Sequence, residues 1–418
     1  MKITHIHIER FRGFQNEDFE VGSLLTAIAG QNGTQKSTLL GIITQTFTLK
    51  TEDSMRVEKP LCGGSYISAF KDKFRLSPTF DKPKGHEWTI SFDAGMDDFT
   101  VESIKRTGDP NVRFWKKGAR QEGDGYISFP TIFLSLKRLV PVAEEAKIIT
   151  DDTLLTQEEL NEFKQLHNKI LIAQTPISSA TTITSKNKQS IGVSTELYDW
   201  NQNSMGQDNL GKIILALFSF KRLHDKYPRQ YKGGILAIDE MDATMYPASQ
   251  VELLKVLRKY ASKLNLQILF TTHSMSLLKA MDDLVQEVTK KEETANQAKI
   301  LYLKKVDDKI AIKQGVNFKG IQLDLNVVAE GNNRKKNRIT AYTEDKENIL
   351  FVKAILKSKA FVLDFVDVTL PCSTLMELVT KRVPAFIYPY SIVILDGDVR
   401  MNKNDLRKIN NADNILIL

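Results

Sequence analysis

Residues 30–38, with the sequence Gly-Gln-Asn-Gly-Thr-Gln-Lys-Ser-Thr, decide the fold class of this chain. The apolar residues 24–29 before them are typical of a buried strand, and the apolar residues 39–43 after them are typical of one face of a helix. A glycine-containing turn from a strand into a helix is the setting of a phosphate-binding P-loop. In that setting Lys36 reaches the outer phosphates of a nucleotide, and the Ser37 hydroxyl ligates Mg²⁺.

The residue before Lys36 departs from the usual P-loop pattern, which has glycine where this chain has Gln35. Glycine lets the backbone pass close to phosphate, so we expect Gln35 to retune the loop or to slow hydrolysis. A chance glycine–serine turn is the alternative for this stretch taken alone, and three downstream segments favour the P-loop. The residues predicted to contact the nucleotide here are Asn32, Gly33, Gln35, Lys36, Ser37 and Thr38.

A second segment, residues 235–240, places two acidic residues at the end of an apolar run. Asp239 is predicted to hold Mg²⁺, directly or through water, and Glu240 to act on the attacking water as the base of a Walker B site. A solvated strand end is the plainer alternative, because Asp and Glu are common there. Residues 241–247 follow with the length and the proline of a D-loop, which favours the catalytic interpretation.

The next predicted strand, at residues 267–270, ends in Thr271-Thr272-His273-Ser274. A histidine at this strand end is suited to contact the γ-phosphate, so His273 is predicted to be a catalytic switch residue. A single histidine is more often structural, but its position one strand after Asp239 favours the functional role.

Residues 203–207, Asn-Ser-Met-Gly-Gln, precede a helical run with apolar residues at 213, 214, 217 and 218. Ser204, Gly206 and Gln207 before a helix, between the P-loop and the Walker B segment, match an ATPase signature motif. The N-terminus of such a helix binds the γ-phosphate held by another subunit. Because one chain carries one P-loop and one signature, two composite sites require a head-to-tail homodimer.

The order of these four motifs resembles that of ABC-type ATPases from the chromosome-maintenance and recombination-repair branch. Residues 6–14, Ile-His-Ile-Glu-Arg-Phe-Arg-Gly-Phe, resemble the entry strand of that branch, and the resemblance implies that Arg12 reaches the nucleotide. It implies an ATPase domain at 1–325, and the alternating segments around 88–92 and 99–104 predict a flanking antiparallel sheet. The insert at about 151–200 is predicted to be helical, without the heptads of a coiled-coil arm.

A second, smaller domain is predicted at residues 339–418, after a basic linker at 326–338. One strand there delivers Glu344, and a later apolar run at 390–395 delivers Asp396-Gly397-Asp398. Three carboxylates at parallel strand ends can hold Mg²⁺ or Mn²⁺ beside a scissile phosphate, and this is the arrangement of a TOPRIM domain.

Other interpretations of this acidic site stay open. Asp345 stands where glycine is usual, and Glu347 is a second candidate for the ligand role of Glu344. A β-turn is the alternative for Asp396-Gly397-Asp398, because Asp and Gly favour turns. The sequence ends at 414–418 within a predicted strand, so we expect the TOPRIM-like domain to be incomplete.

An ABC-type head followed by a TOPRIM-like domain resembles the OLD family of ATP-dependent endonucleases, which includes nucleases of antiphage systems. The resemblance implies that Glu344, Asp396 and Asp398 are catalytic metal ligands of a nuclease. It also implies that nucleic acid, DNA foremost, is the substrate, and that a defence-system protein or an RNA is a candidate partner.

Composition agrees with a cytoplasmic, soluble protein. The chain has 42% hydrophobic and 26% charged residues, and its net charge of +7 favours a polyanionic partner. The basic runs at 116–120 and 334–338 are candidate phosphate contacts. It is at least as consistent with the sequence that the first is a solvated hairpin tip and the second a solvated linker. The two cysteines, Cys62 and Cys372, lie in different predicted domains and indicate no structural disulfide. No apolar stretch is long enough to span a bilayer.

Together these observations predict an α/β fold, in which an ABC-type P-loop ATPase head with a flanking antiparallel sheet and a helical insert precedes a TOPRIM-like α/β domain. The predicted protein is a homodimer or higher oligomer through its heads, and its ATP cycle gates Mg²⁺-dependent cleavage of nucleic acid. The alternative is a nucleotide-operated sensor or scaffold that holds a separate effector, with an inert TOPRIM-like remnant. A transporter ATPase is disfavoured by the fused acidic domain.

Overall fold

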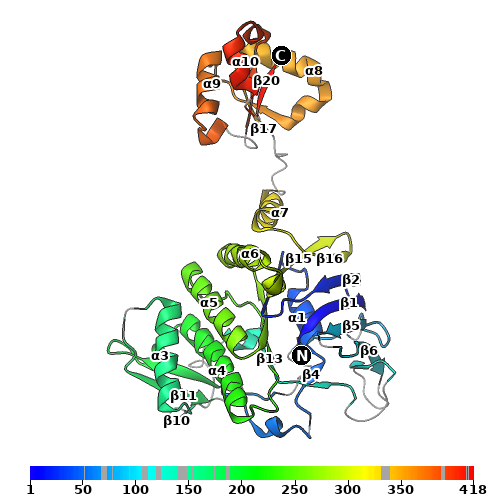
Figure 1. Ribbon diagram of the computed structural model, residues 1–418, viewed down its shortest axis with the longest axis vertical. Helices are drawn as coiled ribbons and strands as arrows, with labels where there is room; N and C mark the ends of the chain where they lie inside the picture. Colours follow the sequence, from blue (N-terminus) through cyan, green and yellow to red (C-terminus); the bar gives the residue numbers. More distant parts are fainter. Residues whose placement is uncertain are drawn as a thin grey trace. The chain divides into compact units, whose positions relative to one another are not determined.

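The computed structural model divides the chain into two units, residues 1–323 and 324–418, each described by itself below (Figure 1). The residues that it describes are 1–50, 52–66, 73–77, 79–93, 95–105, 112–118, 124–139, 148–151, 154–173, 175–184, 189–330, 339–386, 391–410, 412 and 414–418.

The first unit is built on a six-stranded sheet in the order β16-β15-β3-β14-β13-β9. Its first strand in this order is antiparallel to its neighbour and the others are parallel. Ile238 pairs with Phe270, and Thr272 pairs with Ala29, so the carboxyl ends of the central strands meet at one edge. The strands are β16 (Lys309–Lys313), β15 (Ala298–Val306), β3 (Leu25–Gly30), β14 (Leu266–Thr272), β13 (Gly234–Ile238) and β9 (Thr131–Leu134).

The predicted antiparallel sheet is present beside the head, with five strands in the order β2-β1-β5-β6-β7. Buried and half-exposed residues alternate along the strand at Glu87–Phe92, which shows that one face of the sheet is packed and the other is not. The strands are β2 (Phe14–Glu20), β1 (Ile3–Phe11), β5 (Glu87–Phe92), β6 (Phe99–Lys105) and β7 (Val112–Lys116), and a small parallel pair joins β4 (Phe47–Thr48) to β8 (Ile127–Ser128).

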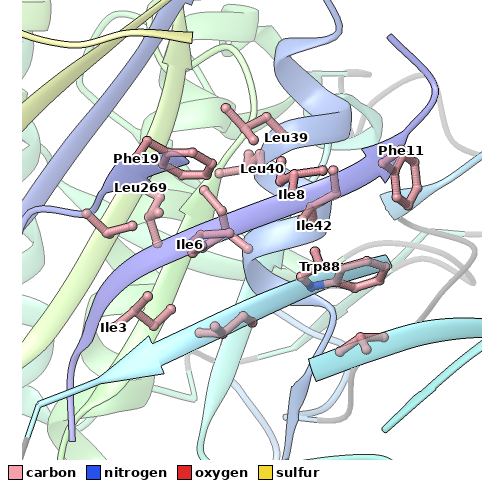
Figure 2. Close-up of a cluster of buried hydrophobic side chains, with 14 of the residues drawn as sticks. Ile3, Ile6, Ile8, Phe11, Phe19, Leu39, Leu40, Ile42, Trp88 and Leu269 are labelled. Atoms are coloured by element: carbon pink, nitrogen blue, oxygen red, sulfur yellow. The ribbon is translucent and has the colours of Figure 1, made fainter. Parts of the chain in front are cut away.

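Helix α1 (Lys36–Thr44) is fixed by a hydrophobic core that it shares with both sheets. Figure 2 shows Ile8 of β1 and Trp88 of β5 close to Ile42 of α1, and Leu269 of β14 belongs to the same core. All four side chains are fully buried. Burying a large apolar side chain contributes about 1.5–3 kcal/mol, so this core holds the start of α1 firmly at the sheet edge.

The insert at residues 151–200 differs from the predicted helical one. Its helix α3 (Gln157–Leu171) lies beside a three-stranded antiparallel sheet of β10 (Ile149–Asp151), β11 (Ser179–Thr184) and β12 (Gln189–Ser194). The strands are rich in Thr, Ile and Val, which favour extended backbone, while their many serine and threonine residues hide the alternation of apolar and polar positions.

Three further helices complete the first unit: α4 (Met205–Lys226), α5 (Pro247–Lys263) and α6 (Met275–Thr289). α4 packs against β12 and α3, α5 packs against β14, and α6 packs against β15. In the part of the chain that the structure describes, no helix has the length and apolar character needed to cross a membrane.

Helix α7 (Phe318–Glu330) runs across the division between the two units. The predicted ATPase domain limit at residue 325 and the start of the predicted linker both fall inside it. Its apolar residues Ile321, Leu325 and Val328 recur at helical spacing, which explains why the helix extends so far. The remainder of the predicted linker, residues 331–338, lies outside the described residues.

The second unit is an α/β unit around a four-stranded parallel sheet in the order β18-β17-β19-β20. Two hydrophobic clusters stabilise it, one around Leu375 and Val393 and one around Ala341 and Ile394. Its elements are β17 (Ile339–Thr343), α8 (Lys346–Leu356), β18 (Leu363–Phe365), α9 (Cys372–Thr380), β19 (Ser391–Leu395), α10 (Lys403–Asn410) and β20 (Ile415–Ile417).

The buried His167 of α3 makes the stability of the first unit depend on pH. Burial lowers the pKa of His167 to about 4, and neither ring nitrogen has a hydrogen-bond partner among the described residues. The unfolded chain binds a proton near pH 6.5, so the stability contribution is complete above that pH and is lost as the pH falls toward 4. Between pH 7 and pH 5 we expect the wild type to lose about 2 kcal/mol of unfolding free energy that His167→Phe keeps.

Urea unfolding at pH 7, 6 and 5 measures this difference. Phe163→Leu is the matched control, because Phe163 stacks on His167 in the same core and carries no titratable group. The unfolding free energy of that variant is expected to lie below that of the wild type by the same amount at each pH, because it keeps His167. Parallel pH profiles of the wild type and His167→Phe would contradict the assignment.

Candidate nucleotide-binding site

The turn between β3 and α1 leaves an open cradle at the helix start. Gly30 has φ +152, and a Cβ there would lie 2.5 Å from the Leu303 carbonyl oxygen, so only glycine fits. Gly33 has φ +80, and an added Cβ would meet nothing within 4 Å among the described residues. α1 begins without a side-chain cap, so the N–H groups of its first turn are available to an anion.

Lys36 lies folded over this turn and is only 7% exposed. Its Nζ donates to the carbonyl oxygens of Gly30 and Gln31, at 3.1 and 2.9 Å. Burial lowers the pKa of Lys36, while the nearby carboxylates of Glu240 and Asp239 act against the shift. The ammonium group is therefore held at the mouth of the cradle and faces the acidic end of β13.

Asp239 joins the start of α1 to the ends of β13 and β14. Its Oδ1 accepts hydrogen bonds from the Ser37 hydroxyl at 2.8 Å and from the Thr271 hydroxyl at 2.7 Å. Ser37 belongs to α1, Asp239 follows β13, and Thr271 belongs to β14. The arrangement gathers hydroxyl and carboxylate oxygens, which are the ligands that Mg²⁺ prefers.

Glu240 and His273 lie at the same edge. Glu240 has φ 50, a left-handed backbone conformation, and its N–H donates to the Thr271 hydroxyl at 2.6 Å. Burial and the charge of Lys36 lower the pKa of His273, and the neighbouring carboxylates raise it less. The structure thus brings together five of the predicted site residues: Lys36, Ser37, Asp239, Glu240 and His273.

Gln35, in the position where the P-loop pattern has glycine, adopts the backbone conformation that glycine would favour. Its φ is 62, and it directly precedes α1. Its Nε2 lies 3.0 Å from where a Cβ of Gly13 would be, so Gly13 leaves room for this side chain. Within the described residues its buried Oε1 has no hydrogen-bond partner. Asn32 is exposed on the neighbouring turn.

Arg12 is held by protein groups beside α1. Its Nε and Nη2 each donate to one oxygen of the Asp81 carboxylate at 3.0 Å, and its Nη1 donates to the Thr38 hydroxyl at 3.3 Å. Burial by itself would raise the pKa of Asp81, but hydrogen bonds from Arg12, the Ser77 N–H and His86 lower it to about 2. Arg12 is therefore an anchored cation next to the cradle.

The signature residues lie at the start of α4. Ser204 and Gln207 form a reciprocal capping box, in which the Ser204 N–H donates to Gln207 Oε1 at 2.8 Å. Gly206 approaches Thr244 so closely that a Cβ would lie 2.5 Å from the Thr244 carbonyl oxygen. Gln207 also donates to the Tyr198 hydroxyl at 2.7 Å. Gly206 thus meets the predicted D-loop, and in the described contacts none of the three residues meets the P-loop of its own chain.

The acidic residues of the second unit lie at adjacent strand ends. Glu344 follows β17 and accepts the Asp396 N–H at 2.8 Å, and Asp396 follows β19. Burial raises the pKa of Glu344, and the charges of Asp398 and Asp396 raise it further. In the described part of the chain, however, no group of three or more His, Cys, Asp or Glu side chains is arranged to hold a metal ion.

The alternatives at this site have structural roles. Asp345 caps α8, because its side chain accepts the Asn348 N–H at 2.9 Å. Glu347 is exposed in the first turn of that helix. Cys372 also lies at this site, which the sequence did not predict. Burial is the main cause that raises its pKa to about 11, and the nearby charges of Glu344 and Asp398 raise it as well.

Four residues that hold the nucleotide-binding site in place were missed in the sequence: Thr271, Asp81, Arg138 and Asn209. Arg138 is buried and donates to the Glu240 carbonyl oxygen at 2.8 Å. Only its position shortly after a short apolar run gave any signal. Asp81 lies 69 residues from its partner Arg12, and no local pattern joins them.

Replacing Gln35 with glycine should stabilise the folded first unit, because a residue that carries a Cβ is strained in the left-handed region. We expect Gln35→Gly to raise the free energy of unfolding by up to about 1 kcal/mol. Gln35→Ala is the matched control, since it removes the side-chain atoms beyond Cβ and keeps the Cβ that causes the strain. Urea unfolding without nucleotide compares them, and equal stability of the two variants would refute the strain.

Three comparisons with known proteins bear on the chain. A family model described as an AAA ATPase domain matches residues 1–191 and 135–278. No curated protein matches the sequence. Among solved structures, the SMC head domain from Thermotoga maritima has a TM-score of 0.42 and 14% identity, with 76% of this chain and 100% of that chain covered.

Two further solved structures are similar at the same level. The SmcHead bound to the C-winged helix domain of ScpA has a TM-score of 0.44 and 13% identity, covering 77% of this chain and 100% of that one. A Smc head domain with an extended coiled coil, bound to the C-terminal domain of ScpA derived from Pyrococcus furiosus, has a TM-score of 0.42 and 13% identity, covering 78% and 99%.

The matched ranges together span residues 1–278 of the 418, and this stretch contains the turn at residues 30–38, the acidic strand end and His273. The prediction of a P-loop ATPase with an α/β fold is thereby confirmed in its general form. This chain belongs to the AAA ATPase domain family.

Proposed function

We propose that the first unit is an ABC-type ATPase head that binds and hydrolyses ATP with Mg²⁺. The observation that carries the proposal is the convergence of Lys36, Ser37, Asp239 and Glu240 on the uncapped start of α1. The open cradle at Gly33 and the oxygen ligands at Asp239 fit a nucleotide phosphate with its cation. Membership of the AAA ATPase domain family supports the same activity.

The residues divide the work by their chemistry. When bound, MgATP supplies the phosphoryl group to be transferred and the cation that neutralises its charge. Lys36 exchanges its carbonyl partners for phosphate oxygens, and Ser37 and Asp239 hold the cation. Glu240 accepts the proton of the attacking water. Asn32, Gly33, Gln35 and Thr38 line the loop, Arg12 stands beside it, and His273 senses the outer phosphate.

A head-to-tail dimer completes this proposal. Gly206 contacts Thr244 in the D-loop of its own chain, and the described contacts join none of Ser204, Gly206 and Gln207 to the P-loop of that chain, so we assign the start of α4 to a nucleotide on a second chain. Met205 at this start is 42% exposed, and Tyr246 of the D-loop is 79% exposed. Exposed apolar side chains around a helix N-terminus suit a surface that is covered on association.

Two substitutions separate nucleotide binding from hydrolysis. Lys36→Ala is expected to weaken ATP binding at least tenfold, because it removes the cation that faces the phosphates. Glu240→Gln is expected to keep ATP binding and to lower kcat by about 100-fold or more, because the amide cannot accept the proton. Titration calorimetry with MgATP and phosphate-release kinetics measure the two effects.

Lys226→Ala is the control, since Lys226 forms a surface ion pair with Glu58. Its binding and kcat should equal those of the wild type. Wild-type binding and turnover in Lys36→Ala would refute the nucleotide site, and full turnover in Glu240→Gln would remove Glu240 from the role of base.

We infer a second activity for the second unit, namely metal-dependent phosphodiester cleavage of nucleic acid, gated by the ATP cycle of the head. Glu344, Asp396 and Asp398 would hold Mg²⁺ or Mn²⁺, and the raised pKa of Glu344 supports a shared acidic site. The net charge of +7 suits a nucleic acid partner, DNA foremost. The resemblance to the OLD family favours a role in antiphage defence, with a defence-system protein or RNA as further partner.

The competing function is a nucleotide-operated scaffold for a separate effector. It is favoured by the lack of a ready metal-binding group among the described residues. In the scaffold, Glu344 and Asp396 would only tie β17 to β19 through their hydrogen bond.

Nicking of supercoiled plasmid distinguishes the two. With Mg²⁺ or Mn²⁺ we expect the wild type to nick DNA in a manner that ATP alters, and Asp396→Asn/Asp398→Asn to lose at least 90% of the activity, about a tenfold effect or more. Asp364→Asn/Glu377→Gln removes two carboxylates of the same unit elsewhere and should cleave normally. Intact plasmid under every condition, with ATP still bound, would support the scaffold.

A further inference from the structure

A buried arginine joins the signature helix to the acidic end of β13. Arg138 lies in the 3₁₀ helix Leu136–Leu139 that follows β9, and it is only 2% exposed. Its Nε donates to Asn209 Oδ1 at 2.7 Å, and its Nη2 donates to the Glu240 carbonyl oxygen at 2.8 Å. One rigid guanidinium therefore touches both α4 and Glu240.

The remaining donors of Arg138 fix its position. Nη1 donates to the carbonyl oxygens of Leu134 and Ser135, at 3.2 and 3.1 Å. The planar guanidinium of Arg138 thus donates to three main-chain carbonyls and one side-chain amide. Because the group is rigid, it cannot move with one partner without changing its hydrogen bonds to the others. A shift of any of these groups is transmitted to the rest.

Asn209 extends the link to the D-loop. It is fully buried in α4, and its Nδ2 donates to the Ala243 carbonyl oxygen at 3.0 Å. Its two ends therefore contact Arg138 on one side and the D-loop on the other. The capping box of Ser204 and Gln207 begins the same helix, so a movement of the signature start reaches Asn209 through less than two turns of helix.

Glu240 needs support of this kind. Its backbone is left-handed, with φ 50, and only contacts from outside can hold it there. Thr271 accepts its N–H and Arg138 donates to its carbonyl oxygen, so the peptide groups on both sides of the carboxylate-bearing residue are fixed. The cation also lies near Asp239 and Asp242, which offset the cost of its burial.

We propose that Arg138 is a positioning residue that, with Asn209, transmits the state of the signature helix to Glu240 and the D-loop. The inference rests on the proposed ATPase function and adds to it a route within one chain. When a nucleotide binds at the start of α4, the helix moves Asn209. Through its hydrogen bond with Asn209, Arg138 then holds Glu240 in the orientation for proton transfer. ATP affinity at Lys36 does not depend on this route, whereas turnover does.

The test uses the full chain and three variants. Arg138→Met removes the fork, and Arg138→Lys keeps the charge without the planar donors. Asn209→Asp keeps the acceptor for Arg138 and loses the donor to Ala243. We expect Arg138→Met to lower kcat about 10- to 100-fold while the KM for ATP changes by less than about threefold. Arg138→Lys and Asn209→Asp should fall between it and the wild type.

A readout without turnover accompanies the kinetics. In hydrogen exchange, MgATP should protect peptides covering 30–38, 203–209 and 240–246 of the wild type. In Arg138→Met, protection at 30–38 should remain and protection at 240–246 should be lost. Arg222→Met is the matched control on α4, because it removes a bidentate ion pair with Glu159 of the insert. It should lower the urea midpoint and leave kcat and the exchange pattern unchanged.

Each result decides something. If folded Arg138→Met and Asn209→Asp keep both wild-type kcat and protection at 240–246, the inference is overturned. If Arg138→Met does not fold, Asn209→Asp decides alone on the same two readouts. If MgATP fails to protect 30–38 in the wild type, the nucleotide site itself is refuted, and the inference falls with it.

Discussion

The carboxylate of Asp239 makes the contact on which the candidate nucleotide-binding site depends. One of its oxygens accepts both the Ser37 and the Thr271 hydroxyl, and this ties α1 to the ends of β13 and β14. The parallel register makes the contact possible, since it brings the three strand ends to one edge. A carboxylate that bonds to two hydroxyls in a buried position is expensive to leave unpaired, at about 1–3 kcal/mol or more. The same oxygens are the ones a cation would take, so the contact orders the ligands before any cation arrives.

Four residues of the candidate site have a strained backbone conformation. Arg12, Gln35, Glu240 and Thr244 all have positive φ, between 50 and 67, although none is glycine. Such conformations cost about 1 kcal/mol each or more and persist only where the surrounding structure fixes them. Here the fixing groups are identifiable: Asp81 for Arg12, and Thr271 with Arg138 for Glu240. Strain at four positions around one edge means that small shifts of the fixing groups have large effects on the residues they hold.

The sequence predicts well those features that are local. The strand and helix around residues 30–38 and the acidic strand end at 235–240 follow from apolar runs next to polar turns, and the structure places them together. The strands at 179–194 were missed because serine and threonine conceal the alternation. Arg138 was missed for another reason: nothing near it in sequence shows that its partners come from α4 and from β13. Burial of a charge is a property of the assembled core, which single-sequence patterns do not contain.

Two arginines, Arg222 within α4 and Arg138 beside it, show why burial decides which contact can transmit a change. Arg222 forms a bidentate pair with Glu159, but its side chain is 40% exposed, so water and salt screen the pair and its contribution is about 1 kcal/mol or less. Water can also replace Glu159 when α3 moves away. Arg138 has no such substitute at 2% exposure, and losing one partner leaves a buried donor or acceptor unsatisfied. Loss of the pair between Arg222 and Glu159 therefore costs little, whereas α4 cannot shift against Glu240 without moving the D-loop as well.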